Sequence, residues 1–121
     1  MTIVLNHTIV PTRDKKAAAR FFAQIFGLKS ERGDYFAPVR LNDQMTLLFD
    51  DGTAFESHHY AFHVSDAEFD AIFNRVKEAG LAYGSDPEHV DNAKLNNWGG
   101  GRGVYFTDPD GHLLELMTVP Q

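Results

Sequence analysis

The chain repeats one pattern of strand, helix and short strands, and this repeat limits the folds that it can adopt. A histidine opens each copy and a glycine follows each helix: His7 with Gly27, and His59 with Gly80. The two histidines are 52 residues apart and the two glycines 53, so the copies align with one residue of slippage. Neither copy is long enough to bury a good core alone. We therefore expect the copies to pack together or to exchange with a second chain.

Both expected helices carry clear terminal signals. Asp14 can cap a first helix whose apolar residues recur at i, i+4 and i+7, and Gly27 suits the left-handed position that ends it. Ser65 and Glu68 have the spacing of a capping box ahead of a second apolar helix, which Gly80 closes. These signals predict two amphipathic helices, one in each copy.

Short strands are expected around the helices, because Ile, Val, Thr and aromatic residues cluster between turn residues. The first strand covers residues 3–10 and is expected to break at Pro11 and Thr12. The others are a hairpin of YFAPVRL and MTLLF, the segments HHYAFHV and LAY, and a final hairpin of VYFT and HLLELMTV. The polar, glycine-rich residues 84–103 are expected to form a long loop.

The order of elements is βαβββ, twice. It predicts an α+β fold in a single domain over residues 1–121, with one module at about 1–52 and the other at about 57–121. A chain of this length supports one compact domain and little more.

Composition removes several classes of function. The net charge of −6 argues against a broad nucleic-acid surface, which needs clustered Lys and Arg, and does not support a basic membrane-binding surface. The chain has no cysteine, which excludes disulfides and thiolate metal sites. No basic region precedes the first apolar segment, and no apolar run approaches the roughly 18 residues of a membrane span. We expect a soluble, cytoplasmic protein with a single domain.

One carboxylate lies in an unusual place. Alternate residues of a strand share a face, so His59 and His63 share one, as do Leu113, Glu115 and Met117 in the last strand. Glu115 is therefore a carboxylate among apolar residues, and desolvating it without a partner is costly. A histidine or a cation is the nearest class of partner that the strands offer.

The segments NHTIV, HHYAFHV and GRGVYFTDPDGHLLELM resemble the vicinal oxygen chelate superfamily, over essentially the whole chain. Its members include glyoxalases, fosfomycin-resistance thiol transferases, extradiol dioxygenases and bleomycin-binding proteins. The resemblance implies paired βαβββ modules whose curved mixed sheet forms a cup around a divalent metal, with the helices outside. It also implies a homodimer with shared sites, in which one chain supplies His7 and its partner supplies the two other metal ligands, His59 and Glu115.

This ligand set implies a metal-dependent enzyme. Two imidazoles and a carboxylate suit one divalent Fe, Mn, Ni or Zn ion per site, and leave positions for a substrate with two adjacent oxygens. Such a metal supports isomerase or lyase chemistry, thiol transfer or dioxygenation. Glyoxalases carry a fourth ligand, a Glu, where this chain has Leu47 or Leu48. Its absence favours thiol transfer or dioxygenation, although the Lys and Ser pattern of fosfomycin transferases is not matched either.

Other side chains are candidates for lesser roles. Tyr105 and His63 are candidates for a catalytic base, and His112 is expected at the surface or bonded to its turn. The long loop supplies three candidates for binding the substrate, two of which are cations able to hold an anion: Trp98, Arg102 and Lys94.

Two other functions are compatible with the same fold. A metal-free protein of the bleomycin-resistance type would sequester a drug in the cup, but such a binder has no physical need of Glu115 in an apolar strand. A purely structural or regulatory dimer would tolerate replacement of all three ligand residues with little change beyond stability.

Overall fold

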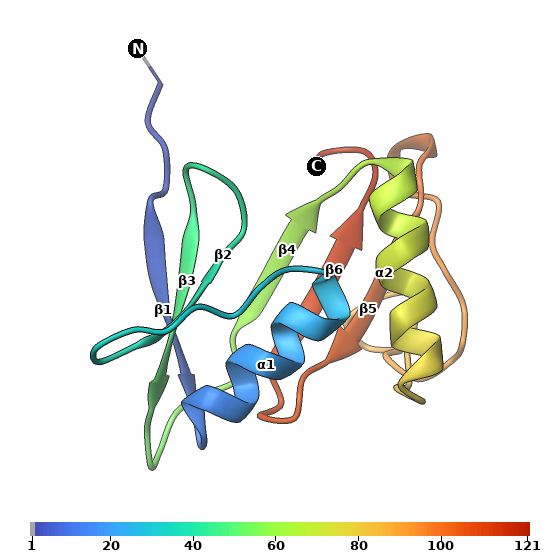
Figure 1. The fold of residues 1–121 in the computed structure, drawn as a ribbon. Coiled ribbons are helices and arrows are strands. Elements are labelled where there is room, and N and C mark those ends of the chain that lie inside the picture. The colour runs from blue at the N-terminus through green and yellow to red at the C-terminus, as the bar shows by residue number, and fades with distance from the viewer. Residues whose placement is uncertain (1) are drawn as a thin grey trace. The chain divides into compact units, whose positions relative to one another are not determined.

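The computed structural model describes residues 2–121, which divide into two compact units at the junction of Glu56 and Ser57 (Figure 1). Each unit holds one α-helix and one mixed three-stranded sheet, so the predicted α+β class with two βαβββ-like modules is confirmed. The first unit contains β1 (His7–Thr12), α1 (Lys15–Phe26), β2 (Ala37–Arg40) and β3 (Thr46–Asp51). The second contains β4 (His59–His63), α2 (Asp66–Glu78), the 3₁₀ turn η1 (Trp98–Gly100), β5 (Gly103–Thr107) and β6 (Leu113–Met117).

Each unit has the predicted order of elements but one regular strand fewer than βαβββ. The segment LAY does not form the expected strand, and the chain after it makes only an isolated bridge between Gly84 and Tyr105. In the first unit, Ser30 likewise makes an isolated bridge with Val39. A Cβ at position 84 would lie 1.7 Å from the carbonyl oxygen of His89. The chain therefore folds back on itself at Gly84, which ends pairing with β5 after one bridge.

The first strand begins and ends later than predicted. In the order β1-β3-β2, β1 runs parallel to β3 at one edge, and it spans His7–Thr12 instead of residues 3–10. Pro11 lies within it, because an edge strand tolerates a residue without a backbone N–H. Thr12, predicted to break the strand, is fully buried, and its hydroxyl accepts a hydrogen bond from the Asp14 backbone N–H at 3.0 Å.

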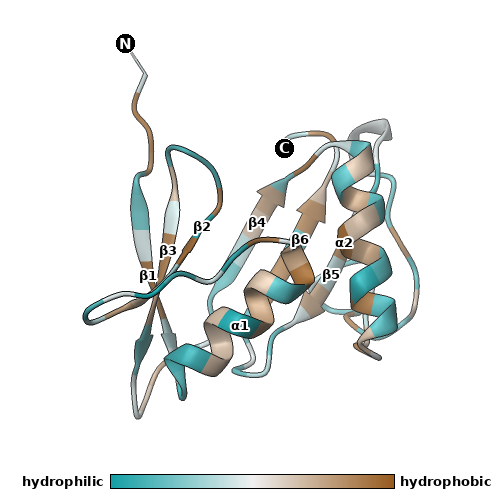
Figure 2. Cartoon of the chain, viewed as in Figure 1, coloured by the Kyte–Doolittle hydropathy of each residue, from teal (hydrophilic) through white to brown (hydrophobic). Residues whose placement is uncertain are grey.

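The α1 helix begins and ends where the sequence predicts. The Asp14 side chain accepts a hydrogen bond from the Ala17 backbone N–H, and Gly27 ends the helix in the left-handed region with φ of 71°. On the buried face, the Phe22 ring lies 5.8 Å from that of Phe49 in β3. Figure 2 shows hydrophilic residues alternating with apolar ones along α1, as expected of a helix with one buried face.

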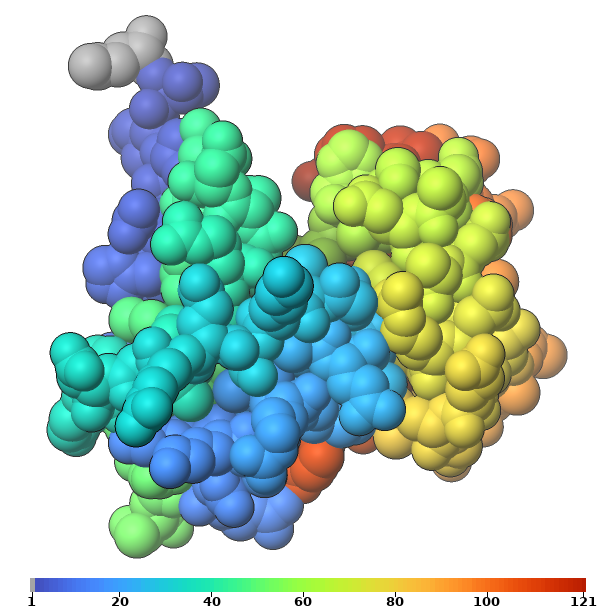
Figure 3. All heavy atoms as spheres, in the orientation of Figure 1, coloured from blue at the N-terminus to red at the C-terminus, as the bar shows by residue number. Residues whose placement is uncertain are grey.

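An apolar arm precedes β1. Ile3 is fully exposed, and Leu5 is 67% exposed. Figure 3 shows this arm standing clear of the sheet that it leads into. Within β1 itself, Ile9 is also exposed, so the apolar surface continues onto the edge strand.

The sheet of the second unit carries a buried set of apolar residues. The order is β4-β6-β5, with β4 parallel and β5 antiparallel to the central β6. One set of alternate residues in β5 and β6 is buried and apolar, as are three residues of α2, and Figure 2 shows β5 and β6 largely as apolar strands. The core of this unit comprises Phe69, Ile72, Val76, Val104, Phe106, Leu114 and Leu116.

The helices are short. The α1 helix has 12 residues and α2 has 13. Across residues 2–121, neither the length nor the apolar character of any helix suffices for crossing a bilayer.

The predicted capping box is present at the start of α2. The Ser65 hydroxyl accepts the Glu68 N–H at 3.1 Å, and the Glu68 carboxylate accepts the Ser65 N–H at 2.8 Å. The bond to the Ser65 backbone, followed by that to its side chain, lowers the pKa of Glu68. A carboxyl whose pKa is lowered by folding stabilises the protein at neutral pH, and that contribution is lost as the pH falls through its folded-state pKa.

We expect Ser65→Ala to lower the free energy of unfolding by about 1 kcal/mol at pH 7. The gap from wild type should narrow between pH 7 and pH 3, because protonation of Glu68 removes the part of the capping box that depends on its charge. Urea denaturation at the two pH values measures both quantities, with Thr53→Ala in an exposed loop as the control. A gap of the same size at both pH values would contradict the assigned role of the Glu68 charge.

Candidate active site

His59 and Glu115 meet on the sheet of the second unit. The strands β4 and β6 run parallel, and the Nε2 atom of His59 lies 2.9 Å from the Oε1 atom of Glu115. The Glu115 side chain, on the central strand, is 4% exposed, and the His59 side chain, on an edge strand, is 46% exposed. The carboxylate is therefore buried, whereas its imidazole partner is partly open to solvent. A histidine is thus the partner of the buried carboxylate, as the strand pattern predicts.

The second oxygen of Glu115 lacks a partner. Its Oε2 atom is buried and makes no hydrogen bond within residues 2–121. A carboxylate oxygen removed from water and left unpaired is costly, and a cation offsets that cost. The imidazole nitrogen of His59 adjoins the same carboxylate, and one oxygen with one imidazole nitrogen suits Fe, Mn, Ni or Zn. These residues therefore fit a divalent metal.

Tyr105 lies directly across the sheet from Glu115. The two residues are paired in the register of β5 and β6, and the Tyr105 ring lies 5.8 Å from that of His59. Burial raises the pKa of the Tyr105 hydroxyl well above its ordinary value, and the nearby Glu115 carboxylate adds to the effect. The hydroxyl therefore stays protonated at neutral pH.

Trp98 borders the same residues from the long loop. Its ring meets that of Tyr105 edge to face at 5.9 Å, and 41% of the residue is exposed. The Asn96 side chain accepts the Trp98 backbone N–H, while the Asn96 backbone pairs in both directions with Gly103 at the start of β5. The loop is therefore tied to the sheet beside Tyr105, and it presents an aromatic ring at the edge of the site.

The two loop cations lie in different surroundings. The guanidinium of Arg102 donates to Asp70 at 2.7 Å and to Asp66 at 3.0 Å, and it lies over the ring of Phe69. These bonds, led by the one to Asp70, raise the pKa of Arg102. The charge of Arg102 is thus engaged by two carboxylates of α2. Lys94 donates its backbone N–H within the loop.

The two other histidine candidates, His63 and His7, have contacts of their own. His63 has its Nε2 atom 3.2 Å from the carbonyl oxygen of Thr118, just after β6. His7 belongs to β1 in the first unit, with its Nδ1 atom 2.8 Å from the side-chain oxygen of Asn6. No group of three His, Asp or Glu side chains able to hold a metal ion is present among residues 2–121.

His112 is fully buried and bonded to its turn, so the second of the two places expected for it, the turn and not the surface, is confirmed. Its Nδ1 atom accepts the backbone N–H of His58, and its own backbone N–H donates to the Asp108 side chain at 2.8 Å. Burial raises the pKa of Asp108, and the adjacent His112 opposes that rise. This turn sets where β6 begins and hence where Glu115 lies, and its Asp-rich DPDG sequence is the signal that predicts it.

The chain is similar to several known enzymes. The solved structure named Oxidase ChaP-H2 is 48% identical, with a TM-score of 0.93 over 99% of this chain and 96% of that one. Glutathione transferase FosA from Serratia marcescens is 28% identical, covering 93% of this chain and 78% of its own length. Metallothiol transferase FosB from Shouchella clausii is 37% identical, but the match covers 50% of this chain and 37% of that relative.

A further structural match and a family match agree with these similarities. Fosfomycin resistance protein FosX from Mesorhizobium Loti shares the fold, with a TM-score of 0.73 and 24% identity over 99% of this chain and 95% of that one. Residues 4–116 match the model of one protein family. The chain belongs to the Glyoxalase/Bleomycin resistance protein/Dioxygenase superfamily.

Proposed function

We propose that the chain is a divalent-metal-dependent enzyme that oxidises a small molecule presenting two adjacent oxygens, with His7, His59 and Glu115 as the metal ligands. The observation that carries this proposal is the buried, unpartnered Oε2 atom of Glu115 beside the His59 imidazole. When bound, a metal such as iron supplies Lewis acidity and the capacity to activate dioxygen. Membership of the superfamily agrees with a small-molecule substrate.

Oxidation is favoured over thiol transfer by the relatives. The 48% identical structure is named an oxidase, and a second structure with 45% identity, Oxidase ChaP-H1, carries the same word. The transferase FosA is only 28% identical. Arg102, which could have bound an anionic substrate, is engaged by two carboxylates of α2 instead.

The surrounding residues have separate tasks in this proposal. Glu115 and His59 hold the metal, and Tyr105, which is paired with Glu115 across β5 and β6, supplies a protonated hydroxyl beside the site. Trp98 offers a partly exposed ring against which an aromatic substrate can stack and which shields the site from water. Lys94 is left as a candidate for contacting the substrate from the loop, and His63 as a candidate base.

The third ligand, His7, is proposed to complete the site of a partner chain in a homodimer. It lies on an edge strand that carries exposed apolar residues, continuing from the exposed arm that includes Ile3 and Leu5. An edge strand with apolar side chains is a ready surface for a second chain.

Mixing inactive His7→Gln and Glu115→Gln subunits tests whether the site is shared between two chains. Random reassociation should restore roughly a quarter of wild-type activity, whereas sites built within one chain would restore none.

A direct assay separates oxidation from thiol transfer. Metal-loaded protein is supplied with a panel of catechols and hydroxyquinones while dissolved oxygen is recorded, and separately with fosfomycin and glutathione while free thiol is recorded. The proposal predicts oxygen uptake with at least one of the vicinal-oxygen compounds, and its loss in Glu115→Gln. Thiol consumption without oxygen uptake on any compound would make the protein a transferase and contradict the proposal.

Trp98→Ala is expected to raise the KM for an aromatic substrate by about tenfold, with a smaller effect on kcat, because stacking is lost while the metal ligands stay. Trp98→Phe should recover most of the loss, since it restores a ring. Metal content should equal that of wild type in both variants. A change confined to kcat would show that Trp98 does not act by binding the substrate.

A further inference from the structure

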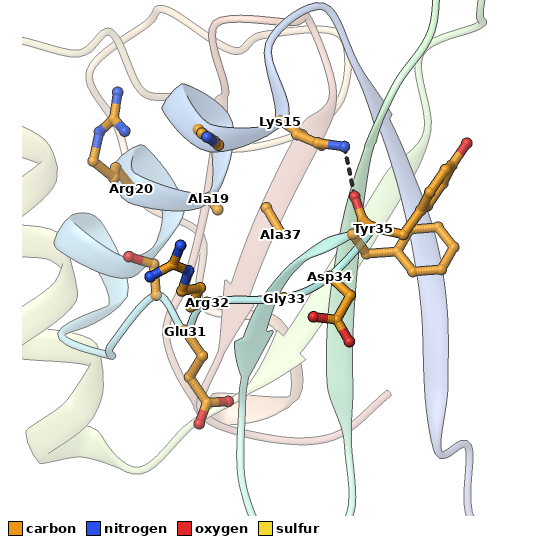
Figure 4. Close-up of a pocket in the computed structure, with 12 residues that line it drawn as sticks. Lys15, Ala19, Arg20, Glu31, Arg32, Gly33, Asp34, Tyr35 and Ala37 are labelled. Carbon is orange, nitrogen blue, oxygen red and sulfur yellow. Dashed lines mark hydrogen bonds between the residues drawn. The ribbon is translucent and has the colours of Figure 1, made fainter.

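The first unit contains a cavity of about 530 Å³ between α1 and the chain that leads into β2 (Figure 4). None of the proposed metal ligands lines it. Although the whole chain has a net charge of −6, basic side chains outnumber acidic ones around this cavity. The basic residues are Lys15, Lys16, Arg20 and Arg32, and the acidic ones are Glu31 and Asp34.

Three of these cations lack an ion-pair partner in the part of the chain that the structure describes. Lys16, Arg20 and Arg32 make no ion pair within residues 2–121. Lys15, by contrast, lies 3.9 Å from a carboxylate oxygen of Asp51 and donates to the carbonyl oxygen of Tyr35 at 2.5 Å. Clustering like charges without compensation is unfavourable, and an anion bound among them relieves it.

The two carboxylates do not supply that compensation. The Glu31 carboxylate lies 3.8 Å from the guanidinium of Arg40, which does not line the cavity. Figure 4 shows the carboxylates of Glu31 and Asp34 pointing away from α1, while the guanidinium of Arg32 points toward it. The side of the cavity that faces α1 is therefore positive.

The wall opposite α1 is a tight turn. A Cβ at Gly33 would lie 2.2 Å from the carbonyl oxygen of Phe36, so only glycine fits there. The Glu31 N–H donates to the Pro38 carbonyl oxygen at 3.0 Å and closes the turn on itself. The cavity is thus bounded by structured chain on both sides.

The cavity also offers aromatic and apolar surface. The Tyr35 residue is 64% exposed, and its ring meets that of Phe36 edge to face at 4.9 Å. Ala19 and Ala37, both buried, add apolar surface to the lining. A ligand that fits this lining has a compact doubly charged anionic group and an aromatic body.

We propose that this cavity binds an aromatic phosphomonoester, with the phosphate held by Lys16, Arg20 and Arg32 and the ring placed against Tyr35 and Phe36. A guanidinium binds phosphate through paired, charge-assisted hydrogen bonds, and the volume lies in the roughly 300–1,000 Å³ range of small-molecule sites. This ligand site is distinct from the proposed metal ligands and does not depend on the proposed oxidation.

Phenyl phosphate is the probe that tests this proposal, titrated into the full chain by calorimetry beside inorganic phosphate and phenol. We expect it to bind at least about tenfold more tightly than either fragment. Arg20→Gln and Arg32→Gln should each weaken binding by about tenfold, because each removes charge-assisted bonds. Lys29→Gln removes the same charge from an exposed residue outside the lining, and should change affinity less than about twofold.

Three results would overturn the proposal: no binding of phenyl phosphate, equal affinity for inorganic phosphate, or unchanged affinity in both arginine variants. Circular dichroism of each variant establishes that it is folded. Glu115→Gln, which removes a proposed metal ligand, should bind phenyl phosphate as wild type does. The experiments therefore distinguish a failure of the proposed metal site from a failure of the proposed phosphomonoester site.

Discussion

Glu115→Gln is expected to lose bound metal while keeping its fold, with an affinity for a first-row divalent ion at least about 100-fold weaker than that of wild type. The amide has nearly the size of the carboxylate, but it carries no charge to offset that of the ion. It also removes the buried, unpartnered carboxylate oxygen from the sheet. Competition with a fluorescent chelator measures the affinity, and circular dichroism measures the fold.

His63→Gln is the matched control for this substitution. His63 lies on β4 with His59, but its ring nitrogen adjoins the carbonyl oxygen of Thr118 instead of Glu115. We expect this variant to bind metal within about twofold of wild type. Equal retention of metal by Glu115→Gln and His63→Gln would show that the carboxylate is not a ligand.

Leu116→Ala is expected to lower the free energy of unfolding by about 2–5 kcal/mol, because it empties space in a packed interior. Leu116 is fully buried on the central strand β6. The same substitution at Leu95, which is 37% exposed on the long loop, should cost less than about 1 kcal/mol. Urea denaturation at pH 7 measures both. Equal losses would contradict the position of the second unit's core on the β6 face that carries Leu116.

Local signals explain how much of the fold could be predicted. The Asp14 cap, the Ser65 capping box and the left-handed Gly27 act within a few residues, so the ends of both helices follow from sequence. The strands were less predictable. Pro11 is acceptable only because β1 is an edge strand, and Gly84 leaves the sheet because of its close approach to His89. Neither fact is contained in the local pattern.

The candidate site likewise combines features that the sequence predicts with features that it does not. Strand alternation predicts that Glu115 needs a partner and that a histidine can supply it. It does not predict that Tyr105 lies opposite Glu115, because that register depends on the turn held by buried His112. The engagement of Arg102 by α2 could not be predicted either, since its carboxylate partners lie more than 30 residues earlier in the chain.

The proposed metal ligands are tested most directly by crystallography of the metal-loaded protein, with anomalous diffraction recorded at the absorption edge of the ion. We expect one peak per chain, at about 2.0–2.2 Å from the His59 imidazole and the Glu115 carboxylate. His7, from the same chain or from a partner, should be the third ligand. Fully loaded crystals with no peak beside Glu115, or with the ion held by other residues, would contradict the account.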